Sequence, residues 1–414
     1  MTFRSLPVLE ELKKLFKPRV SFGNIYLVCV QHLLETTGSM FEALIDIGFH
    51  PGNIFVKGKP YSTNPAVQLN LLKMGIQVYL SETQSGYGHL RENHKKGVIA
   101  MWRSVSSRLL KHDIIIVIDD GGLAIRHIPP DVIHDDYYCY GIEQTTSGLR
   151  YQPGRREIPI IQVATSAAKT KLEPILISRA LNSKLHDLLL RIKPSIIGIV
   201  GYGNIGRALA DFFSTIYRVM VFDIREIHVQ KKSNDILIAD SLELLIHECD
   251  VIIGATGVDI SVQVDWESIV NRDKTLISVS SYDIEFGTLL RQQNSNNSGS
   301  TSIDLLSDLI VKLKNGCILN LIRGGTVANF DNSKESCPAL EIQLTRGLLF
   351  SSIIQILNAH LSKSEELNGP TKLDSGLQRL VVETWFTNYP RFKELYPAEL
   401  INSFKDKEWV ENNS

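Results

Sequence analysis

The sequence carries no excess of either charge and no block of like charge. Lys and Arg number 44 against 45 Asp and Glu in 414 residues, so the formal net charge is −1 at pH 7. Surfaces that bind nucleic acid or anionic membranes usually present clustered basic residues. We therefore expect neither a nucleic acid nor a membrane as a partner.

Cysteine is scarce and follows no pattern. The five cysteines are odd in number and scattered, without a C-x-x-C pair, which indicates neither a disulfide framework nor a zinc site. We expect no metal. Apolar runs approaching the roughly 18 residues of a membrane span are also missing, and residues 1–17 resemble an amphipathic helix more than a signal peptide. These absences predict a reduced, cytoplasmic protein.

The sequence does contain a complete dinucleotide-binding pattern. An apolar strand at 196–200 is followed by a G-x-G-x-x-G turn, a helical pattern and a second apolar strand at 218–222. The turn and the start of the helix contain Gly201, Gly203, Asn204, Ile205 and Gly206. In such turns the first glycine allows the tight bend, the second lets the backbone approach a pyrophosphate, and the third lets helix and strand pack closely. The free N–H groups at the helix start favour the phosphates.

Asp223 ends the second strand, seventeen residues after the last glycine. An acidic residue there accepts hydrogen bonds from the adenosine ribose and repels a 2′-phosphate, which favours NAD over NADP. Arg225 lies two residues further on and keeps NADP open as the alternative.

Apolar strand-like segments and helical patterns alternate along the rest of the chain. Strands are expected at 24–30, 53–56, 78–80, 114–118, 158–165, 236–238, 251–255, 275–279 and 317–321. Helices are expected at 36–47, 65–74, 97–110, 175–192 and 340–361, and the polar run 292–302 is expected to be a mobile surface loop.

This alternation predicts an α/β protein with two Rossmann-like domains. A substrate domain would span residues 1–175 and be completed by about 335–414. An NAD-binding domain with a doubly wound parallel sheet would be inserted at 190–330. Open parallel sheets bind ligands beyond the carboxyl ends of their strands, so polar residues at strand ends are the candidate site.

Several short stretches, in the same order, resemble the S-adenosylhomocysteine hydrolase family. They are V-I-D-D-G-G at 117–122, E-Q-T-T-S-G at 143–148, A-A-K-T-K-L-E at 167–173, G-Y-G-N-I-G-R at 201–207, A-T-G-V-D-I at 255–260, S-Y-D-I-E at 281–285 and L-N-L at 319–321. The resemblance implies a small nucleoside-type substrate and a homo-oligomer, either a dimer or a tetramer. It also implies a cycle in which NAD takes hydride from the ribose 3′-hydroxyl, a base removes the C4′ proton, the 5′-thiol leaves, water adds and the hydride returns.

The resemblance also implies roles for individual residues. Lys169 would lie beside the 3′-oxygen and exchange a proton with it, while Glu173 would orient the sugar hydroxyls. Asp120 and His32 occupy positions that serve proton transfer at C4′ and C5′, and Gln144 occupies the position of a ribose-binding glutamate.

The expected contacts with NAD come from several segments. The nicotinamide end would meet Thr145, Thr146, Ser147 and Ser281, the ribose would meet Thr256 and Gly257, and the carboxamide would meet Asn320. The three hydroxyl residues at 145–147 also suit a helix N-cap, a role that is compatible with cofactor contacts.

Other positions depart from the family. Gln144 and Ser281 replace a glutamate and a histidine, while Leu34, Leu123, Ala164 and Pro174 replace polar residues of the motifs. The family's G-H-P is absent from 322–328, and its lysine–tyrosine tail is absent from the C-terminus. The cofactor half of the pattern therefore fits better than the adenosylhomocysteine half.

Two further functions fit the sequence. The stretch N-L-I-R-G-G-T-V at 320–327 resembles a motif of D-2-hydroxyacid dehydrogenases, in which Arg323 would bind the substrate carboxylate. The departures from the hydrolase family at Gln144, at Ser281 and at the C-terminus also suit a non-catalytic NAD-binding regulator derived from a hydrolase.

Overall fold

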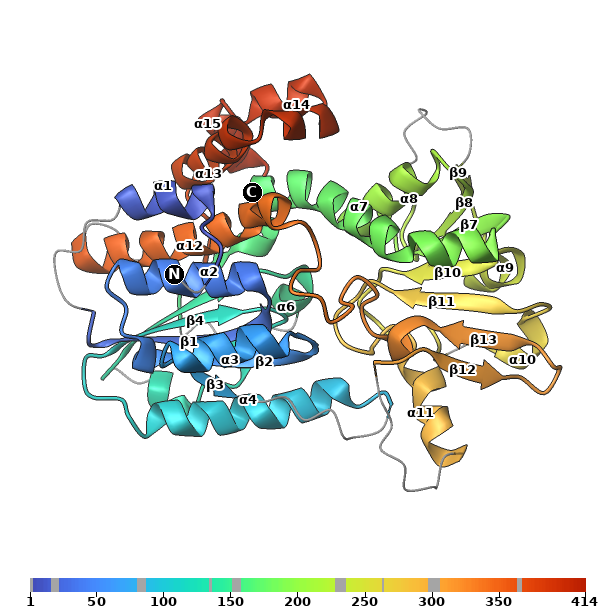
Figure 1. Ribbon diagram of the computed structural model, residues 1–414, viewed down its shortest axis with the longest axis horizontal. Coiled ribbons are helices and arrows are strands. Elements are labelled where there is room, and N and C mark those ends of the chain that lie inside the picture. Colours follow the sequence, from blue (N-terminus) through green and yellow to red (C-terminus); the bar gives the residue numbers. More distant parts are fainter. Residues whose placement is uncertain are drawn as a thin grey trace. The chain divides into compact units, whose positions relative to one another are not determined.

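The computed structural model describes residues 3–15, 22–79, 87–133, 136–150, 158–227, 236–262, 264–296, 306–362 and 367–414. The chain divides into two compact units, each with its own sheet (Figure 1). Unit 1 comprises Met1–Ser81, His94–Glu173 and Asn332–Ser414, and unit 2 comprises Glu82–Asn93 and Pro174–Asp331. The predicted α/β class with two Rossmann-like sheets is confirmed.

The described part of unit 1 holds a seven-stranded parallel sheet in the order β14-β6-β5-β4-β1-β2-β3. Its strands are β1 (Ile25–Leu33), β2 (Ile54–Thr63), β3 (Gln77–Tyr79), β4 (Ile114–Asp119), β5 (Tyr138–Glu143), β6 (Ile160–Gln162) and β14 (Pro370–Thr371). All residues of β4 are buried, and its run of β-branched side chains suits a strand covered on both faces. β1 and β4 pair at the centre of this sheet.

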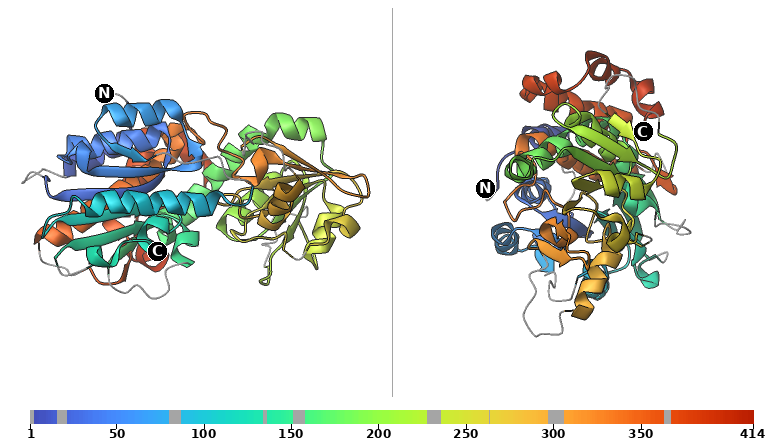
Figure 2. Two further views of the ribbon diagram at one scale, coloured as in Figure 1. Left: turned by 90° about the horizontal axis from the view of Figure 1, so that it is seen from below. Right: turned by 90° about the vertical axis from the view of Figure 1, so that its right-hand side faces the viewer.

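The helices of unit 1 cover both faces of its sheet, with α2 and α12 on one side and α4 on the other (Figures 1 and 2). They are α1 (Pro7–Leu15), α2 (Glu35–Asp46), α3 (Pro65–Lys73), α5 (Leu123–Arg126), α6 (Thr146–Arg150), α12 (Ala339–Ser362), α13 (Ser375–Asn388), α14 (Ala398–Ser403) and α15 (Lys407–Asn412). Two more helices, α4 (Leu90–Ser106) and α7 (Ala167–Ile192), contain residues of both units.

Helix α12 corrects one expectation from the sequence. The segment Ala339–Leu361 is long and apolar enough to cross a membrane by length and composition, although no such run was expected. In the structure, 89% of the most apolar 18-residue stretch of this helix is buried, and the helix packs against α1, α2 and α13. Its hydrophobicity is thus accounted for by the core of unit 1.

The described part of unit 2 holds a sheet in the order β12-β13-β11-β10-β7-β8-β9, parallel except for β12 against β13. Its strands are β7 (Ile196–Val200), β8 (Arg218–Phe222), β9 (Ile236–Ile238), β10 (Val251–Gly254), β11 (Lys274–Ser278), β12 (Leu309–Lys312) and β13 (Ile318–Leu321). Its helices are α8 (Asn204–Phe213), α9 (Leu242–Glu248), α10 (Trp266–Ile269) and α11 (Gly287–Asn296). β7 and α8 hold the predicted glycine turn between them.

A bulge in β2 shapes the candidate site of unit 1. Gln31 of β1 pairs with Gly58, but Leu33 pairs with Thr63. Two steps along β1 therefore correspond to five along β2, and the extra residues leave the regular ladder. The Thr63 hydroxyl donates to the Lys59 carbonyl at 2.8 Å and closes the bulge. Bulges redirect side chains, and this one turns Lys59 and Ser62 towards the end of β1.

Several expected boundaries were wrong. The expected strand 158–165 is only β6 followed by a short 3-10 turn, Val163–Thr165. The helical bridge expected at 175–192 begins earlier, at Ala167, and runs through Pro174. The loop expected at 292–302 is helical as far as Asn296, and its remainder lies outside the described residues.

Candidate functional site

Polar side chains gather at the carboxyl ends of neighbouring parallel strands in unit 1. Gln31 and His32 lie near the end of β1, and Asp119 and Glu143 end β4 and β5. This edge is where an open α/β sheet binds its ligand. The fold thus brings together residues that are more than a hundred positions apart.

The Asp120 carboxylate is the centre of this group. Its Oδ1 accepts a hydrogen bond from the Lys59 ammonium, and its Oδ2 accepts one from the Gln144 amide. His32 Nε2 lies 3.1 Å from the same Oδ2, and His32 Nδ1 lies 2.5 Å from Ser62 Oγ. Three predicted residues, His32, Asp120 and Gln144, are therefore in direct contact, together with two that the sequence did not indicate.

Burial and charge act in opposite directions on this group. Burial alone raises the pKa of Asp120, but the Lys59 charge and the hydrogen bonds from His32 and Lys59 outweigh it and hold the pKa well below the ordinary value. Burial lowers the pKa of His32, and Asp120 offsets only part of that shift. At neutral pH Asp120 is therefore an ion and His32 a neutral ring that can take up a proton.

Arg346 of α12 extends the network on its other side. Its Nη1 donates to Gln31 Oε1 at 3.4 Å, and Gln31 donates in turn to Gln144 Oε1 at 3.1 Å. Its Nε donates to the Thr36 hydroxyl at 3.2 Å, and Thr36 also donates through its backbone N–H and its hydroxyl to Glu335. Burial raises the pKa of Glu335 to about 7, although Arg346 opposes the shift.

Lys169 and Glu173 form an ion pair one helical turn apart on α7. Their side chains are 14% and 12% exposed, so both are largely buried but keep some access to solvent. Glu173 Oε1 also accepts a hydrogen bond of 2.6 Å from the Thr345 hydroxyl on α12. Burial lowers the pKa of the Arg346 guanidinium, and the charges of Glu335, Asp120 and Glu173 act to raise it. Arg346 thus links the Lys169 pair electrostatically with the Asp120 group.

The site members that sequence reasoning missed include Lys59, Ser62, Glu335, Thr345 and Arg346. Lys59 and Ser62 belong to the bulge, which the strand expected at 53–56 did not reach. The other three lie more than 160 residues from their partners. Arg346 is a charged residue inside the apolar run of α12, and that anomaly was the one signal available in the sequence.

In unit 2, the glycine turn has the geometry of a dinucleotide site. Gly201 has a φ of +96°, and a Cβ on Gly206 would overlap the Gly201 carbonyl oxygen. A Cβ on Gly203 would meet nothing within 4 Å, so open space lies before the start of α8. The residues therefore fit the group, with a tight bend, close helix packing and an open approach for a pyrophosphate.

Asp223 lies at the position expected for ribose recognition. Its Oδ2 accepts a 2.7 Å hydrogen bond from the backbone N–H of Tyr202 in the glycine turn. Its Oδ1 accepts from Arg225 Nε at 3.2 Å, and the Arg225 side chain is 69% exposed. Burial acts to raise the pKa of Asp223, but these partners lower it, so Asp223 is an anion at neutral pH.

The other predicted cofactor residues are distributed over both units. Ser281 is half-buried after β11, and Asn320 is half-buried within β13. The Thr256 and Gly257 backbone N–H groups and the Thr256 hydroxyl donate to the buried Glu285. That buried carboxyl organises their turn, a role that the sequence did not indicate.

Thr145, Thr146 and Ser147 belong to unit 1 and begin α6. The Thr145 hydroxyl accepts from the Gly148 N–H at 3.0 Å and donates to Glu143 Oε1 at 2.7 Å. The Ser147 hydroxyl donates to Thr145 Oγ1 at 3.2 Å. The helix-capping role is present in the structure, and their contact with a cofactor stays a prediction.

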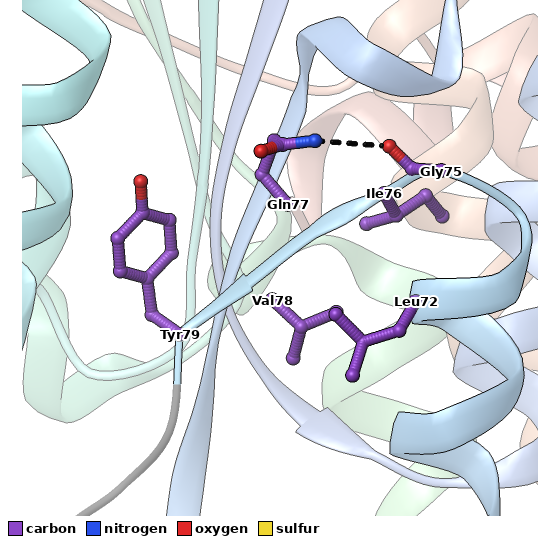
Figure 3. A pocket seen from close by; sticks show the side chains of 6 residues that line it. All are labelled: Leu72, Gly75, Ile76, Gln77, Val78 and Tyr79. Atoms are coloured by element: carbon purple, nitrogen blue, oxygen red, sulfur yellow. Dashed lines mark hydrogen bonds between the residues drawn. The ribbon is translucent and has the colours of Figure 1, made fainter.

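A hollow of about 230 Å³ lies along the edge strand β3 and the turn that precedes it (Figure 3). Residues 72 and 75–79 line it, and the Gln77 amide donates to the Gly75 carbonyl at 3.1 Å within it. None of the predicted site residues contributes to this hollow.

Comparison with known proteins gives partial matches. An uncharacterized protein of Mycobacterium tuberculosis is 31% identical over 344 residues, so the match covers 81% of this chain but only 64% of that relative. An adenosylhomocysteinase of Saccharolobus solfataricus is 24% identical over 218 residues, 50% of this chain and 48% of that enzyme. A solved 2-hydroxyacid dehydrogenase of Ketogulonicigenium vulgare shares 12% identity with a TM-score of 0.37, covering 76% of this chain and 96% of its own. No family model matches. The fold assignment therefore depends on the sheet topology.

Two glycine substitutions separate packing from cofactor binding in unit 2. Gly206→Ala should destabilise unit 2 by about 1–3 kcal/mol, because its Cβ overlaps a backbone oxygen. Gly203→Ala should leave thermal stability unchanged yet weaken NAD binding by about tenfold or more, since its Cβ enters the open approach. Thermal unfolding and calorimetric titration of NAD measure the two effects. Unchanged NAD affinity in Gly203→Ala would contradict the placement of the pyrophosphate.

Glu335 should make stability depend on pH. Its pKa rises from an ordinary 4.5 to about 7 in the folded chain, so the folded state holds the proton more tightly. Stability should therefore fall as pH rises from about 4.5 to about 7, by up to about 3 kcal/mol. Urea unfolding of the wild type and of Glu335→Gln across this range gives the difference. Parallel curves for the two proteins would contradict the assignment.

Proposed function

We propose that the chain is an NAD-dependent enzyme that reversibly oxidises a hydroxyl group of a small nucleoside-type substrate, in the manner of adenosylhomocysteinase. The observation that supports this most is that His32, Asp120 and Gln144 are in contact at the carboxyl ends of the unit 1 strands. The Lys169–Glu173 ion pair is linked to them electrostatically through Arg346. The partial similarity to an adenosylhomocysteinase points the same way.

NAD, when bound, supplies the hydride acceptor for the alcohol carbon. The neutral amine of Lys169 takes the proton of the reacting hydroxyl, and Glu173 then holds the resulting ammonium through the ion pair that the structure shows. Thr345 fixes Glu173 from the opposite helix and so keeps the pair in one orientation.

In this proposal His32 is the base for the second proton transfer, the removal of the C4′ proton. Asp120 stays ionised beside Lys59, so it is a poor acceptor at neutral pH, while the neutral His32 ring can accept. Asp120 then orients His32 and stabilises the protonated ring, and Ser62 holds the other ring nitrogen. This proposal narrows the sequence expectation, in which both Asp120 and His32 served proton transfer at C4′ and C5′.

The substrate is expected to differ from adenosylhomocysteine. Lys59 adds a buried positive charge to the site, and Gln144 lacks the charge of the family's glutamate. Leu34 is buried where the family has a threonine, and Thr36 donates its hydrogen bonds to Glu335. These changes support a related nucleoside or thioether. A homo-oligomer remains part of the proposal.

A second candidate is a D-2-hydroxyacid dehydrogenase activity centred on Arg323. The structure gives Arg323 a left-handed backbone, with φ of 51°, and its N–H bonds to Asp308 at 2.8 Å. This unusual conformation at the N-x-x-R-G-G motif favours a specific role for the residue.

Substrate-dependent reduction of bound NAD distinguishes these candidates. The NAD-loaded protein is mixed with S-adenosylhomocysteine, adenosine, other nucleosides or D-2-hydroxyacids, and reduced nicotinamide is followed by absorbance. Reduction by a nucleoside supports the proposal, and reduction only by a hydroxyacid supports the Arg323 candidate. NAD that stays bound and oxidised with every compound would contradict both and favour a regulator.

Lys169→Ala should lower the rate of this reduction by at least about a hundredfold, because the hydroxyl proton loses its acceptor. NAD affinity should not change. Lys171→Ala is the matched control, since Lys171 is exposed on the same helix and should retain the wild-type rate. Equal rates in the two variants would remove Lys169 from the proposed chemistry.

A further inference from the structure

Two buried carboxyls lie side by side directly behind the Asp120 group. Asp119 ends β4, Glu143 ends β5, and the two residues pair with each other in the parallel register. Directly paired residues of neighbouring strands project to the same face of a sheet. Both residues are 0% exposed. The two acids thus lie next to each other on the same face of the sheet without access to water.

In each carboxyl, one oxygen accepts hydrogen bonds from the surrounding chain. Asp119 Oδ2 accepts from the Ile125 N–H at 2.8 Å, while Glu143 Oε1 accepts from the N–H and hydroxyl of Thr145 and from the Gly121 N–H at 3.2 Å. The remaining oxygens, Asp119 Oδ1 and Glu143 Oε2, are buried and have no hydrogen-bond partner in the described part of the chain. Buried polar atoms without partners are rare, and two on paired residues call for a common explanation.

The local charges do not balance if all the acids are ionised. Asp119, Asp120 and Glu143 are three carboxyls, and the cation that stabilises Asp119 is Lys59, which is already bonded to Asp120. His32 is neutral, and the Cys29 thiol on β1 stays protonated because burial raises its pKa. Burial raises the pKa values of Asp119 and Glu143; the Asp120 charge adds to the rise at Asp119, and the Asp119 charge adds to the rise at Glu143. Adjacent carboxylates in such a setting retain a proton.

Two glycines, Gly122 and Gly148, allow the backbone to pack closely against the Glu143 carboxyl. A Cβ on Gly148 would overlap the Glu143 carboxyl, and a Cβ on Gly122 would approach Gly148 to 3.0 Å. The glycines of D-D-G-G and E-Q-T-T-S-G thus bring the two turns together over the acids. Asp120 and Gln144 follow Asp119 and Glu143 in these same turns.

We propose that Asp119 and Glu143 share one proton in a hydrogen bond between Asp119 Oδ1 and Glu143 Oε2, and that this bond positions Asp120 and Gln144. The bond joins the ends of β4 and β5 at the point where the site begins. Both acids are positioning residues, since they act through their neighbours. The positioning role rests on the proposed function, whereas the shared proton does not.

Infrared spectroscopy of the full chain tests the shared proton. A protonated carboxyl has a carbonyl stretch separate from those of amides and carboxylates, and it shifts in D2O. We expect this band in the wild type at pH 8, above the range in which Glu335 holds its proton. Asp119→Asn and Glu143→Gln should each abolish the band, since the amide donates to the remaining carboxylate. Glu335→Gln, which alters another buried carboxyl, should keep it.

The histidine signal of His32 tests the positioning role. In Asp119→Asn and Glu143→Gln the amide N–H replaces the shared O–H, so the NMR titration of His32 and the rate of NAD reduction should stay within about threefold of the wild type. Glu143→Val removes the bond and should shift the His32 titration. If Glu143→Val does not fold, Asp119→Leu removes the same bond from the neighbouring strand and takes its place in this test.

Absence of the band in the wild type, or its survival in both amide variants, would overturn the shared proton. A band present in the wild type, together with an unshifted His32 titration in folded Glu143→Val, would overturn the positioning role alone. An intact band in a protein that never reduces NAD would leave the shared proton standing and count against the proposed function.

Discussion

The site of unit 1 depends on one interaction, the buried ion pair of Lys59 and Asp120. Neither side chain has access to bulk water, and each would be strongly destabilising without the other. The pair keeps Asp120 ionised, and the ionised Asp120 in turn fixes His32 and Gln144. The bulge of β2 contains Lys59 and places its ammonium beside the Asp120 carboxylate. The irregular backbone of β2 and the geometry of the candidate site are therefore linked here.

The two units differ in how their candidate sites are built. Unit 2 is a regular dinucleotide fold, in which glycines and Asp223 suffice to form the proposed NAD site. Unit 1 carries a dense network in which charged groups on α7, α12 and the sheet influence one another. Most of the departures from the hydrolase motifs, including Leu34, Leu123, Gln144 and Ala164, lie in unit 1. Pro174, Ser281 and the segment 322–328 are the exceptions, because they belong to unit 2.

The sequence predicted the parts of the molecule that local pattern controls. The strands β7 and β8 and the glycine turn follow directly from apolar runs and spacing, and so does β4. Lys59 could not be predicted, because a lysine in a polar segment is ordinarily exposed and nothing local signals a bulge. Arg346 and Glu335 were missed because their partner Thr36 is about three hundred residues away, a distance over which one sequence carries no contact information. Helix α11 was not predicted, and its polar end was expected to belong to a surface loop.

A double-mutant cycle on Lys59 and Asp120 tests the account most directly. Lys59→Met and Asp120→Asn are made singly and together, and urea unfolding is followed by tryptophan fluorescence, since Trp102, Trp385 and Trp409 all lie in unit 1. Each single change should cost about 3–5 kcal/mol by leaving a buried charge without its partner. The double change should cost clearly less than their sum, with a coupling of about 1–3 kcal/mol. Additive single effects would show that the ion pair does not hold this site together.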